Sequence, residues 1–336
     1  MSSPALAVVV IGRNEGPRLT ACLESVRASC NMPEPAELIY VDSNSTDGSP
    51  ERAAEFGARV IVLGSGKQSA ARARNAGWRS AIAPFILFLD GDTVLNRDFV
   101  HLAMKEFQNP QVAVVWGHRR ELRPEASLYN RILDLDWIYP PGYTDFCGGD
   151  ALMRRSSLED VNGFNADLIA GEEPDMCRRM RVMGHLILHI AIPMTGHDLA
   201  ISGFSQYWRR SVRTGHAYAE ISVLYRDTPD PLWSRESRRN LWLGSLYVLT
   251  AILLGAASIL LRSIVPLLAG ALGFAALTIR TARSFRWKGV SWTTLLMFGI
   301  HSHIQQLPIL QGQILYLWGR WRSQRSELIE YKSGPQ

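Results

Sequence analysis

Short runs of apolar residues alternate with amphipathic helical patterns over residues 6–90. The apolar runs are rich in Val, Ile and Leu, as is typical of strands that are buried on both faces. Between these runs apolar residues recur at helical spacing, as Leu19, Leu23 and Val26 do. The pattern predicts strands over 6–11, 37–41, 59–63 and 85–89, and helices over 17–29, 50–56 and 69–81. We therefore expect an α/β, Rossmann-like fold in which a mostly parallel sheet carries helices on both faces.

The pattern is less regular over residues 112–197. It predicts one more strand over 112–116 and a helix at the acidic segment Gly171-Glu172-Glu173-Pro174-Asp175. Glu172 or Glu173 can stand in the first turn of that helix, and Pro174 suits its first position.

Two long segments without charged residues follow, at 241–261 and 264–279. At 1.5 Å per residue the first can cross a hydrocarbon core of about 30 Å, whereas the second is marginal. The short break at Arg262-Ser263 predicts a tight transmembrane helical hairpin, and a buried helical pair in a soluble domain is the alternative. Residues 290–319 mix His, Gln and Pro with apolar and aromatic residues, which predicts one amphipathic helix in the membrane interface.

These patterns predict three domains. The α/β domain covers 1–235, the hairpin covers 236–281, and the interfacial helix with a basic tail covers 282–336. The four cysteines form no C-x-x-C pair, which favours reduced thiols in a cytosolic compartment.

Basic residues gather at the two ends of the predicted hairpin and contribute to a formal net charge of +5. They are Arg235, Arg238 and Arg239 before it, and Arg280, Arg283, Arg286 and Lys288 after it. Only Arg262 lies between the two apolar segments, so the positive-inside rule places the α/β domain and the C-terminus on the cytoplasmic side of a bacterial-type inner (plasma) membrane. The chain has no zinc-finger spacing, RNP aromatics or basic helix repeat, which argues against a nucleic-acid partner.

Two carboxylates follow the predicted strand 85–89, in the segment Asp90-Gly91-Asp92. At the open end of a sheet they can converge on one hard cation, and Mg²⁺ or Mn²⁺ binds oxygen ligands that it shares readily with phosphates. A polar turn after a strand is the alternative, because the same residues favour turns.

Two further polar segments lie at the same predicted edge of the sheet. Asp42 opens the segment that ends at Asp47-Gly48, and its carboxylate can accept hydrogen bonds from a base or a ribose. The segment from Lys67 to Arg74-Asn75-Ala76-Gly77 brings basic side chains that suit phosphate. Asx-turns in the first segment and a solvated helix face in the second are the alternatives.

Taken together, these segments resemble the family-2 inverting glycosyltransferases of the GT-A fold. The matching segments are 8–15, 41–48, 74–77, 90–92, Gly148-Gly149-Asp150 with the acidic segment 171–175, and Gln206-Tyr207-Trp208-Arg209-Arg210, which is similar to the family's Q-x-x-R-W signature. The resemblance covers roughly residues 6–218, about two thirds of the chain. Each segment is weak alone, but their order and spacing make the resemblance specific.

The resemblance implies roles for particular residues. Asn14, Glu15 and Asp42 are expected to hold the nucleoside, and Asp90 and Asp92 the ribose, the metal and the diphosphate. Glu173 matches the position of the catalytic base, which takes a proton from the acceptor hydroxyl.

Two departures from the family pattern affect these roles. The base position usually carries Asp, and here Glu172 and Asp175 flank Glu173 and are alternative bases. Helix capping is the structural interpretation that we favour for Glu172 and Asp175.

Three more residues receive roles by resemblance. His197 stands where some relatives place a third metal ligand, although a lone His is often structural. Arg209 and Arg210, together with Arg74, are expected to neutralise the diphosphate. Arg210 replaces the terminal Trp that processive synthases use for their acceptor chain, so we expect a non-processive enzyme.

The sequence therefore predicts a metal-dependent transferase, anchored in the membrane, that moves one sugar from a UDP- or GDP-sugar to a hydroxyl of a lipid-linked glycan, as in exopolysaccharide assembly. Transfer to a polyprenyl phosphate is one alternative, although a phosphate acceptor needs no base. A catalytically silent membrane scaffold that binds nucleotide is another. The acidic segment at Glu173, together with Asp90 and Asp92, favours the first interpretation.

Overall fold

The structure is a computed structural model that describes residues 3–64, 66 and 68–322. Lys67 and the part of the predicted basic tail over 323–336 lie outside the described residues. The chain forms two compact units. The first comprises 1–123 and 137–199, and the second comprises 124–136 and 200–336. The contacts therefore group residues 200–235 with the C-terminal helices, whereas the predicted first domain includes them.

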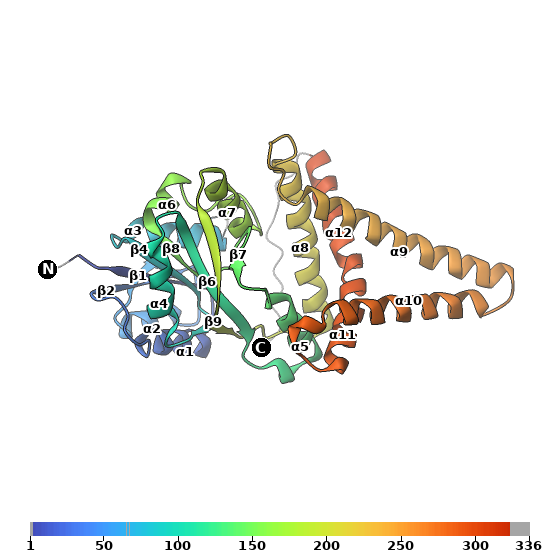
Figure 1. The fold of residues 1–336 in the computed structure, drawn as a ribbon, viewed down its shortest axis with the longest axis horizontal. Helices are drawn as coiled ribbons and strands as arrows, with labels where there is room; N and C mark the ends of the chain where they lie inside the picture. The colour runs from blue at the N-terminus through green and yellow to red at the C-terminus, as the bar shows by residue number, and fades with distance from the viewer. Residues whose placement is uncertain (1–2, 65, 67, 323–336) are drawn as a thin grey trace. The chain divides into compact units, whose positions relative to one another are not determined.

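A twisted sheet forms the centre of the first unit, and helices flank it (Figure 1). The strands β1 (Leu6–Gly12), β2 (Ala36–Asp42), β3 (Arg59–Val62) and β4 (Phe85–Asp90) pair in parallel, in the order β3-β2-β1-β4. They are the four strands that the apolar runs predict, and they differ from the predicted bounds by one residue at most. The predicted α/β fold is confirmed.

The other half of the sheet is mixed in direction. Its strands are β5 (Thr93–Leu95), β6 (Val112–Glu121), β7 (Gly142–Tyr143), β8 (Ala151–Arg154) and β9 (Leu186–His197). Strand β8 enters antiparallel between β4 and β6, whereas β6 and β9 are parallel. Strand β6 extends five residues past the predicted end at 116, because its polar half continues to pair with β9.

The helices of the first unit include the four that the sequence predicts and two short ones, over 99–103 and 155–160, that it does not. They are α1 (Pro17–Arg27), α2 (Ser49–Glu55), α3 (Ala70–Ser80), α4 (Phe99–Ala103), α6 (Arg155–Asp160) and α7 (Glu172–Val182), with a 3₁₀ turn at Met104–Gln108. Ser69 caps α3 by accepting a hydrogen bond from the Arg72 backbone N–H. Gly77 lets α3 approach the sheet, because a Cβ there would lie 2.2 Å from Val9 Cγ1.

Helix α7 begins at Glu172, so Pro174 is its third residue and not its first. Proline is tolerated there because the first backbone N–H groups of a helix have no partner within it. Gly171 precedes the helix with φ 85°, a left-handed conformation that favours glycine. Both glutamates therefore stand in the first turn, where the helix dipole stabilises negative charge.

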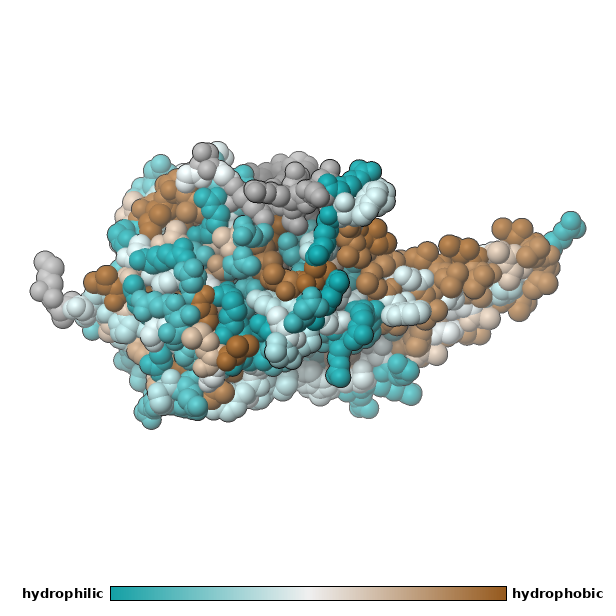
Figure 2. Space-filling view, turned by 90° about the horizontal axis from the view of Figure 1, so that it is seen from above, coloured by the Kyte–Doolittle hydropathy of each residue, from teal (hydrophilic) through white to brown (hydrophobic). Residues whose placement is uncertain are grey.

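The second unit is helical. Its longer elements are α5 (Leu128–Asp134), α8 (Phe204–Leu224), α9 (Ser234–Leu260), α10 (Val265–Ser284), α11 (Trp292–Ile304) and α12 (Gln306–Trp321). Helices α9 and α10 form the predicted hairpin, and both are long and apolar enough to cross a membrane by length and composition. Only 6% and 11% of their most apolar stretches are buried within the protein. The hairpin surface is correspondingly hydrophobic in Figure 2.

The single helix predicted over 290–319 is wrong, because this segment forms two helices, α11 and α12, that meet at Gln305. Helix α12 packs closely on α8 through two glycines. A Cβ on Gly312 would lie 2.0 Å from the Val212 carbonyl oxygen, and one on Gly215 would lie 2.1 Å from the Ile309 carbonyl oxygen. Sequence patterns do not predict this contact, since glycines within apolar helices show no periodicity.

We predict that Gly312→Ala destabilises the second unit by about 1–3 kcal/mol, because the new methyl group overpacks a backbone contact. Gly319→Ala on the same helix is the matched control, since a Cβ there meets nothing within 4 Å. The control is expected to be neutral or to stabilise by up to about 1 kcal/mol. Thermal unfolding of both variants in detergent tests this, and equal stability of the two would contradict the contact.

Candidate active site

The site lies at the carboxyl ends of the parallel strands. The register places Asp42 beside Gly12 and Asp90 beside Ile11, so both aspartates end strands that flank β1. Ligands of open α/β sheets bind at this edge. Gly91 turns the chain close to β1, since its backbone N–H donates to the Ile11 carbonyl at 2.7 Å.

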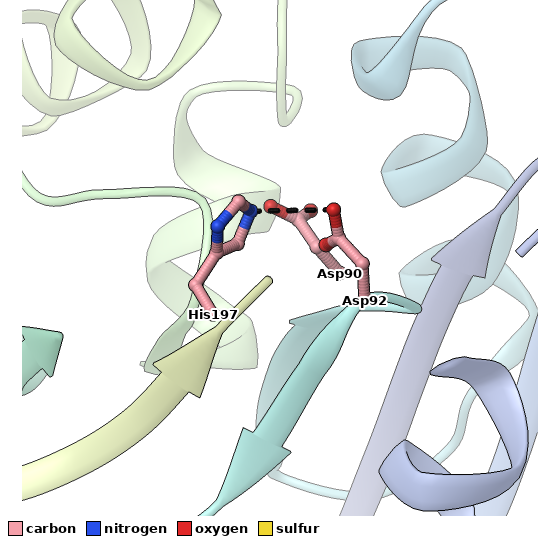
Figure 3. A group of neighbouring side chains, drawn as sticks. All are labelled: Asp90, Asp92 and His197. Carbon is pink, nitrogen blue, oxygen red and sulfur yellow. Dashed lines mark ion pairs between the residues drawn. The ribbon is translucent and has the colours of Figure 1, made fainter. Parts of the chain in front are cut away.

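Asp90, Asp92 and His197 converge on one point (Figure 3). One donor atom from each lies within 4.8 Å of the other two, and His197 Nε2 is 3.3 Å from Asp92 Oδ2. Backbone pairing brings them together, because Thr93 on β5 pairs with His197 on β9. Two carboxylates and an imidazole suit a divalent cation such as Mn²⁺ or Mg²⁺. The donor set and its spacing therefore fit the expected metal.

Arg74 ties this cluster to the acidic helix. Its Nη2 donates to Asp90 Oδ1 at 2.8 Å, and its Nη1 donates to Glu172 Oε1 at 3.1 Å and Glu173 Oε1 at 2.9 Å. The guanidinium is buried, so hydrogen bonds to these three carboxylates replace the hydration that it would have in solvent. Arg74 is predicted to contact phosphate, whereas here three carboxylates surround it.

A glycine makes room for this arrangement. A Cβ on Gly149 would lie 2.4 Å from Arg74 Nη2, 3.1 Å from Asp90 Oδ2 and 3.3 Å from Glu173 Oε1. The backbone at Gly149, one of the two glycines in the segment Gly148-Gly149-Asp150, therefore contacts these charged side chains closely.

The three acidic residues of α7 differ in exposure and in partners. The side chain of Glu173 is 16% exposed, against 8% for Glu172 and 1% for Asp175. Asp175 bonds Arg179 on its own helix at 2.7 Å, and Glu172 is held by Arg74. Glu173 is thus the most accessible of the three to solvent. Glu172 stands in the first turn of α7, where the helix dipole stabilises its charge, and its carboxylate also bonds the Arg74 side chain on α3.

The environment of Glu173 changes its acidity. Burial and, after it, the negative charge of Glu172 raise the pKa of its carboxyl to about 7, against the opposing effect of Arg74. A carboxyl with a pKa near neutrality is suited to accept a proton at physiological pH.

The structure adds Asp150, which belongs to a segment that carries the family resemblance, and Arg119, for which the sequence suggested no role. Asp150 is buried, and it accepts the Asp90 backbone N–H at 2.9 Å and the Thr195 hydroxyl at 2.7 Å. Burial raises the pKa of Asp150 to about 6. Arg119, from the polar half of β6, lies 3.5 Å from Asp90 Oδ2 and faces the ring of Trp137. The only signal in the sequence for Arg119 was a run of polar residues after an apolar strand.

Asn14 and Asp42 hold the loop after β2. The Asn14 side chain accepts the Thr46 backbone N–H at 2.8 Å, and Asp42 accepts the Tyr40 hydroxyl at 3.0 Å and the Ser45 N–H at 2.7 Å. Asp42 is fully buried. The burial of Tyr40 and the adjacent Asp42 carboxylate together raise the pKa of the Tyr40 hydroxyl. These bonds shape the loop, and the predicted nucleoside contacts stay a prediction.

Glu15 lies beside the segment Asp90-Gly91-Asp92, since a Cβ on Gly91 would lie 3.1 Å from Glu15 Cγ. Glu15 pairs with Arg18 at 2.8 Å at the start of α1. Arg209 and Arg210 belong to α8 in the second unit, where Arg209 is exposed. Gln206 Oε1 accepts the Gly203 backbone N–H at 3.1 Å, so this glutamine stabilises the start of α8.

Comparison with known proteins gives a consistent result. Residues 7–161 match the sequence family described as glycosyl transferase family 2. EpsH of Bacillus subtilis (strain 168) is 31% identical over 242 residues, which cover 67% of this chain and 70% of that protein.

Other similarities are more distant. The pre-mycofactocin glycosyltransferase of Mycobacterium tuberculosis is 27% identical over 175 residues, and the match spans only 37% of its length. The mannosyltransferase PcManGT of Pyrobaculum calidifontis, solved with GDP-Man and Mn²⁺, has the same fold. Its TM-score is 0.70 at 20% identity, over 95% of this chain and 89% of that one.

We predict that Asp92→Asn weakens Mn²⁺ binding at least about ten-fold, because the variant loses one charged ligand of the cation. Asp98→Asn is the matched control, since Asp98 is exposed a few residues along the same segment. The electron paramagnetic resonance signal of free Mn²⁺ measures both affinities. Equal affinity of Asp92→Asn and the control would contradict the site.

We predict that Arg74→Ala destabilises the first unit by about 3–5 kcal/mol near neutral pH, because buried carboxylates lose their counter-ion. The loss should shrink as the pH falls, since the unpaired carboxylates then take up protons in the folded state. The control is Arg79→Ala on the same helix, where the arginine is exposed. Denaturant unfolding at about pH 8 and about pH 5 tests this, and a pH-independent loss would argue against the ion cluster.

Proposed function

We propose, because the chain belongs to glycosyl transferase family 2, that it transfers a single sugar from a nucleotide-diphosphate sugar to a hydroxyl group of a lipid-linked glycan. The observation that carries this proposal is the Arg74 guanidinium, which holds Asp90 of the metal cluster and Glu173 in one site. Asp90, as a donor-binding group, and Glu173, as a base, are therefore close enough to contact the same sugar.

The candidate metal ligands support the binding of a nucleotide-sugar donor. Asp90, Asp92 and His197 are the residues that would hold Mg²⁺ or Mn²⁺, and a bound cation supplies positive charge against a leaving diphosphate. PcManGT, which has this fold, was solved with a GDP-sugar and Mn²⁺. We infer a UDP- or GDP-sugar as the donor of this chain, with Asn14, Glu15 and Asp42 beside its nucleoside.

The acceptor side depends on Glu173. Its carboxylate takes the proton of the acceptor hydroxyl while that oxygen bonds the anomeric carbon and the bond to the diphosphate breaks. Attack from the side opposite the leaving group inverts the anomeric configuration. The base must be ionised to act, so a pKa of about 7 makes activity fall as the pH drops through neutrality.

The hairpin supports a membrane-associated acceptor. Helices α9 and α10 expose apolar side chains along their length, as Figure 2 shows. A bilayer is the surroundings in which such a surface is stable. We infer a bacterial-type inner membrane, with the sheet and the C-terminus on the cytoplasmic side, and an acceptor glycan carried by a lipid.

We predict that Glu173→Gln lowers kcat by at least about 100-fold, because the amide cannot accept the proton. Glu159→Gln, on the exposed surface of α6, is the matched control. Transfer of labelled sugar from a panel of nucleotide sugars into the lipid extract of membranes is the measurement. The wild-type kcat should fall as the pH is lowered below about 7, and the product should show the inverted anomer by NMR.

Other outcomes point to the alternatives. Full transfer by Glu173→Gln would indicate a phosphate acceptor or a different base. Absence of both transfer and metal-dependent donor hydrolysis, in protein that still binds nucleotide, would indicate a scaffold.

A further inference from the structure

We propose that the base of the hairpin, where α9 begins and α10 ends, binds the headgroups of anionic phospholipids. The proposal rests on the hairpin entering a bilayer and does not depend on the transfer reaction. Six exposed arginines, which we call the arginine belt, carry it: Arg235, Arg238, Arg239, Arg280, Arg283 and Arg286.

The belt lies at one end of the hairpin. Helices α9 and α10 are antiparallel and pack together, with Gly270 placed where a Cβ would meet Leu254 Cδ1 at 2.4 Å (Figure 1). The start of α9 and the end of α10 therefore lie at the same end of the hairpin. At the opposite end the turn carries a single charged residue, Arg262, which is exposed.

The described residues supply few negative charges near the belt. Glu236 is the one acidic residue between 231 and 288, and within the described part of the chain no carboxylate forms an ion pair with a belt arginine. Unpaired exposed arginines near a bilayer are attracted to negative headgroups. Charge complementarity thus favours an anionic surface over a zwitterionic one.

Tryptophans mark the same level as the belt. Trp242 follows the arginines of α9 by less than one turn, and Trp287 and Trp292 follow those of α10, and all three are exposed. Exposed tryptophans favour the headgroup region of a membrane. From Arg239 to Arg262 the helix spans roughly 35 Å, slightly more than a hydrocarbon core of about 30 Å. The belt and the turn therefore fall at the two interfaces.

Lys288 shows what distinguishes the belt from the packed cations nearby. It is partly buried, donates to the Leu135 carbonyl and faces the ring of Phe298, so it serves packing within the unit. The belt arginines instead lie on α9, on α10 and in the 3₁₀ turn Arg286–Lys288, and all are open to solvent. This spread suits many headgroups of a fluid surface and offers no enclosed pocket for one phosphate group.

The test uses the full-length protein in bilayer nanodiscs of mixed phosphatidylcholine and phosphatidylglycerol. Electron paramagnetic resonance of spin-labelled lipids measures how strongly each lipid associates with the protein. We expect at least about a two-fold preference for phosphatidylglycerol at about 0.05 M salt, which should fall toward one at about 0.5 M as charges are screened.

Three triple variants then distinguish the effect of the arginine charges from an effect on folding. The triple variant R235Q/R238Q/R239Q should lose about half of the preference, and R235K/R238K/R239K should keep it. The control triple R27Q/R79Q/R97Q removes three exposed arginines of the first unit and should leave the preference unchanged.

Several results would overturn the proposal. These are a wild-type preference near one at low salt, an unchanged preference in the Gln triple, or an equal loss in the control. Selective association of spin-labelled polyprenyl diphosphate without phosphatidylglycerol would also overturn it, because the belt would then bind one lipid carrier. Failure of the protein to enter nanodiscs would remove its premise, whereas loss of sugar transfer alone would not affect it.

Discussion

The site depends on one buried cation. The guanidinium of Arg74 lies between α3, the end of β4 and the start of α7, and it is bonded to a carboxylate from each of the last two. An unpaired charge in such a place costs several kcal/mol, so these three segments are stable only when they meet. Residues far apart in the sequence are held together by this requirement. A glycine is needed at position 149, since a side chain there would displace Arg74 and the carboxylates that it bonds.

The charges around this cation do not balance. Five carboxylates gather here, from Asp90, Asp92, Asp150, Glu172 and Glu173, against the two guanidinium groups of Arg74 and Arg119. The surplus of negative charge favours a divalent cation and opposes an approaching diphosphate in its absence. The same surplus, with burial, explains why Glu173 and Asp150 hold their protons to higher pH than ordinary carboxyls. Under the proposed function, metal binding and proton transfer would therefore be linked through one electrostatic environment.

Much of the first unit could be predicted from the sequence, because its strands are short apolar runs and its helices are periodic. The carboxyl ends of these strands locate Asp42 and Asp90 without any further information. The contacts of Arg74, Asp150 and Arg119 could not be predicted, since they depend on how β6, β8 and α7 return to the sheet. The break between α11 and α12 was missed for a related reason, because the glycine contacts that place α12 on α8 leave no periodic pattern.

The pairing of β5 with β9 has a consequence for the behaviour of the molecule in a crowded solution. Strand β5 is only three residues long and stands at the last position of the sheet. Short edge strands offer little template for another chain, yet a short strand is also easily peeled away. Asp92 directly precedes β5 and His197 ends β9. A cation bound by both residues would therefore hold the two strands together. Under the proposed function, the cation that binds the donor diphosphate would then also protect this edge of the sheet against aggregation.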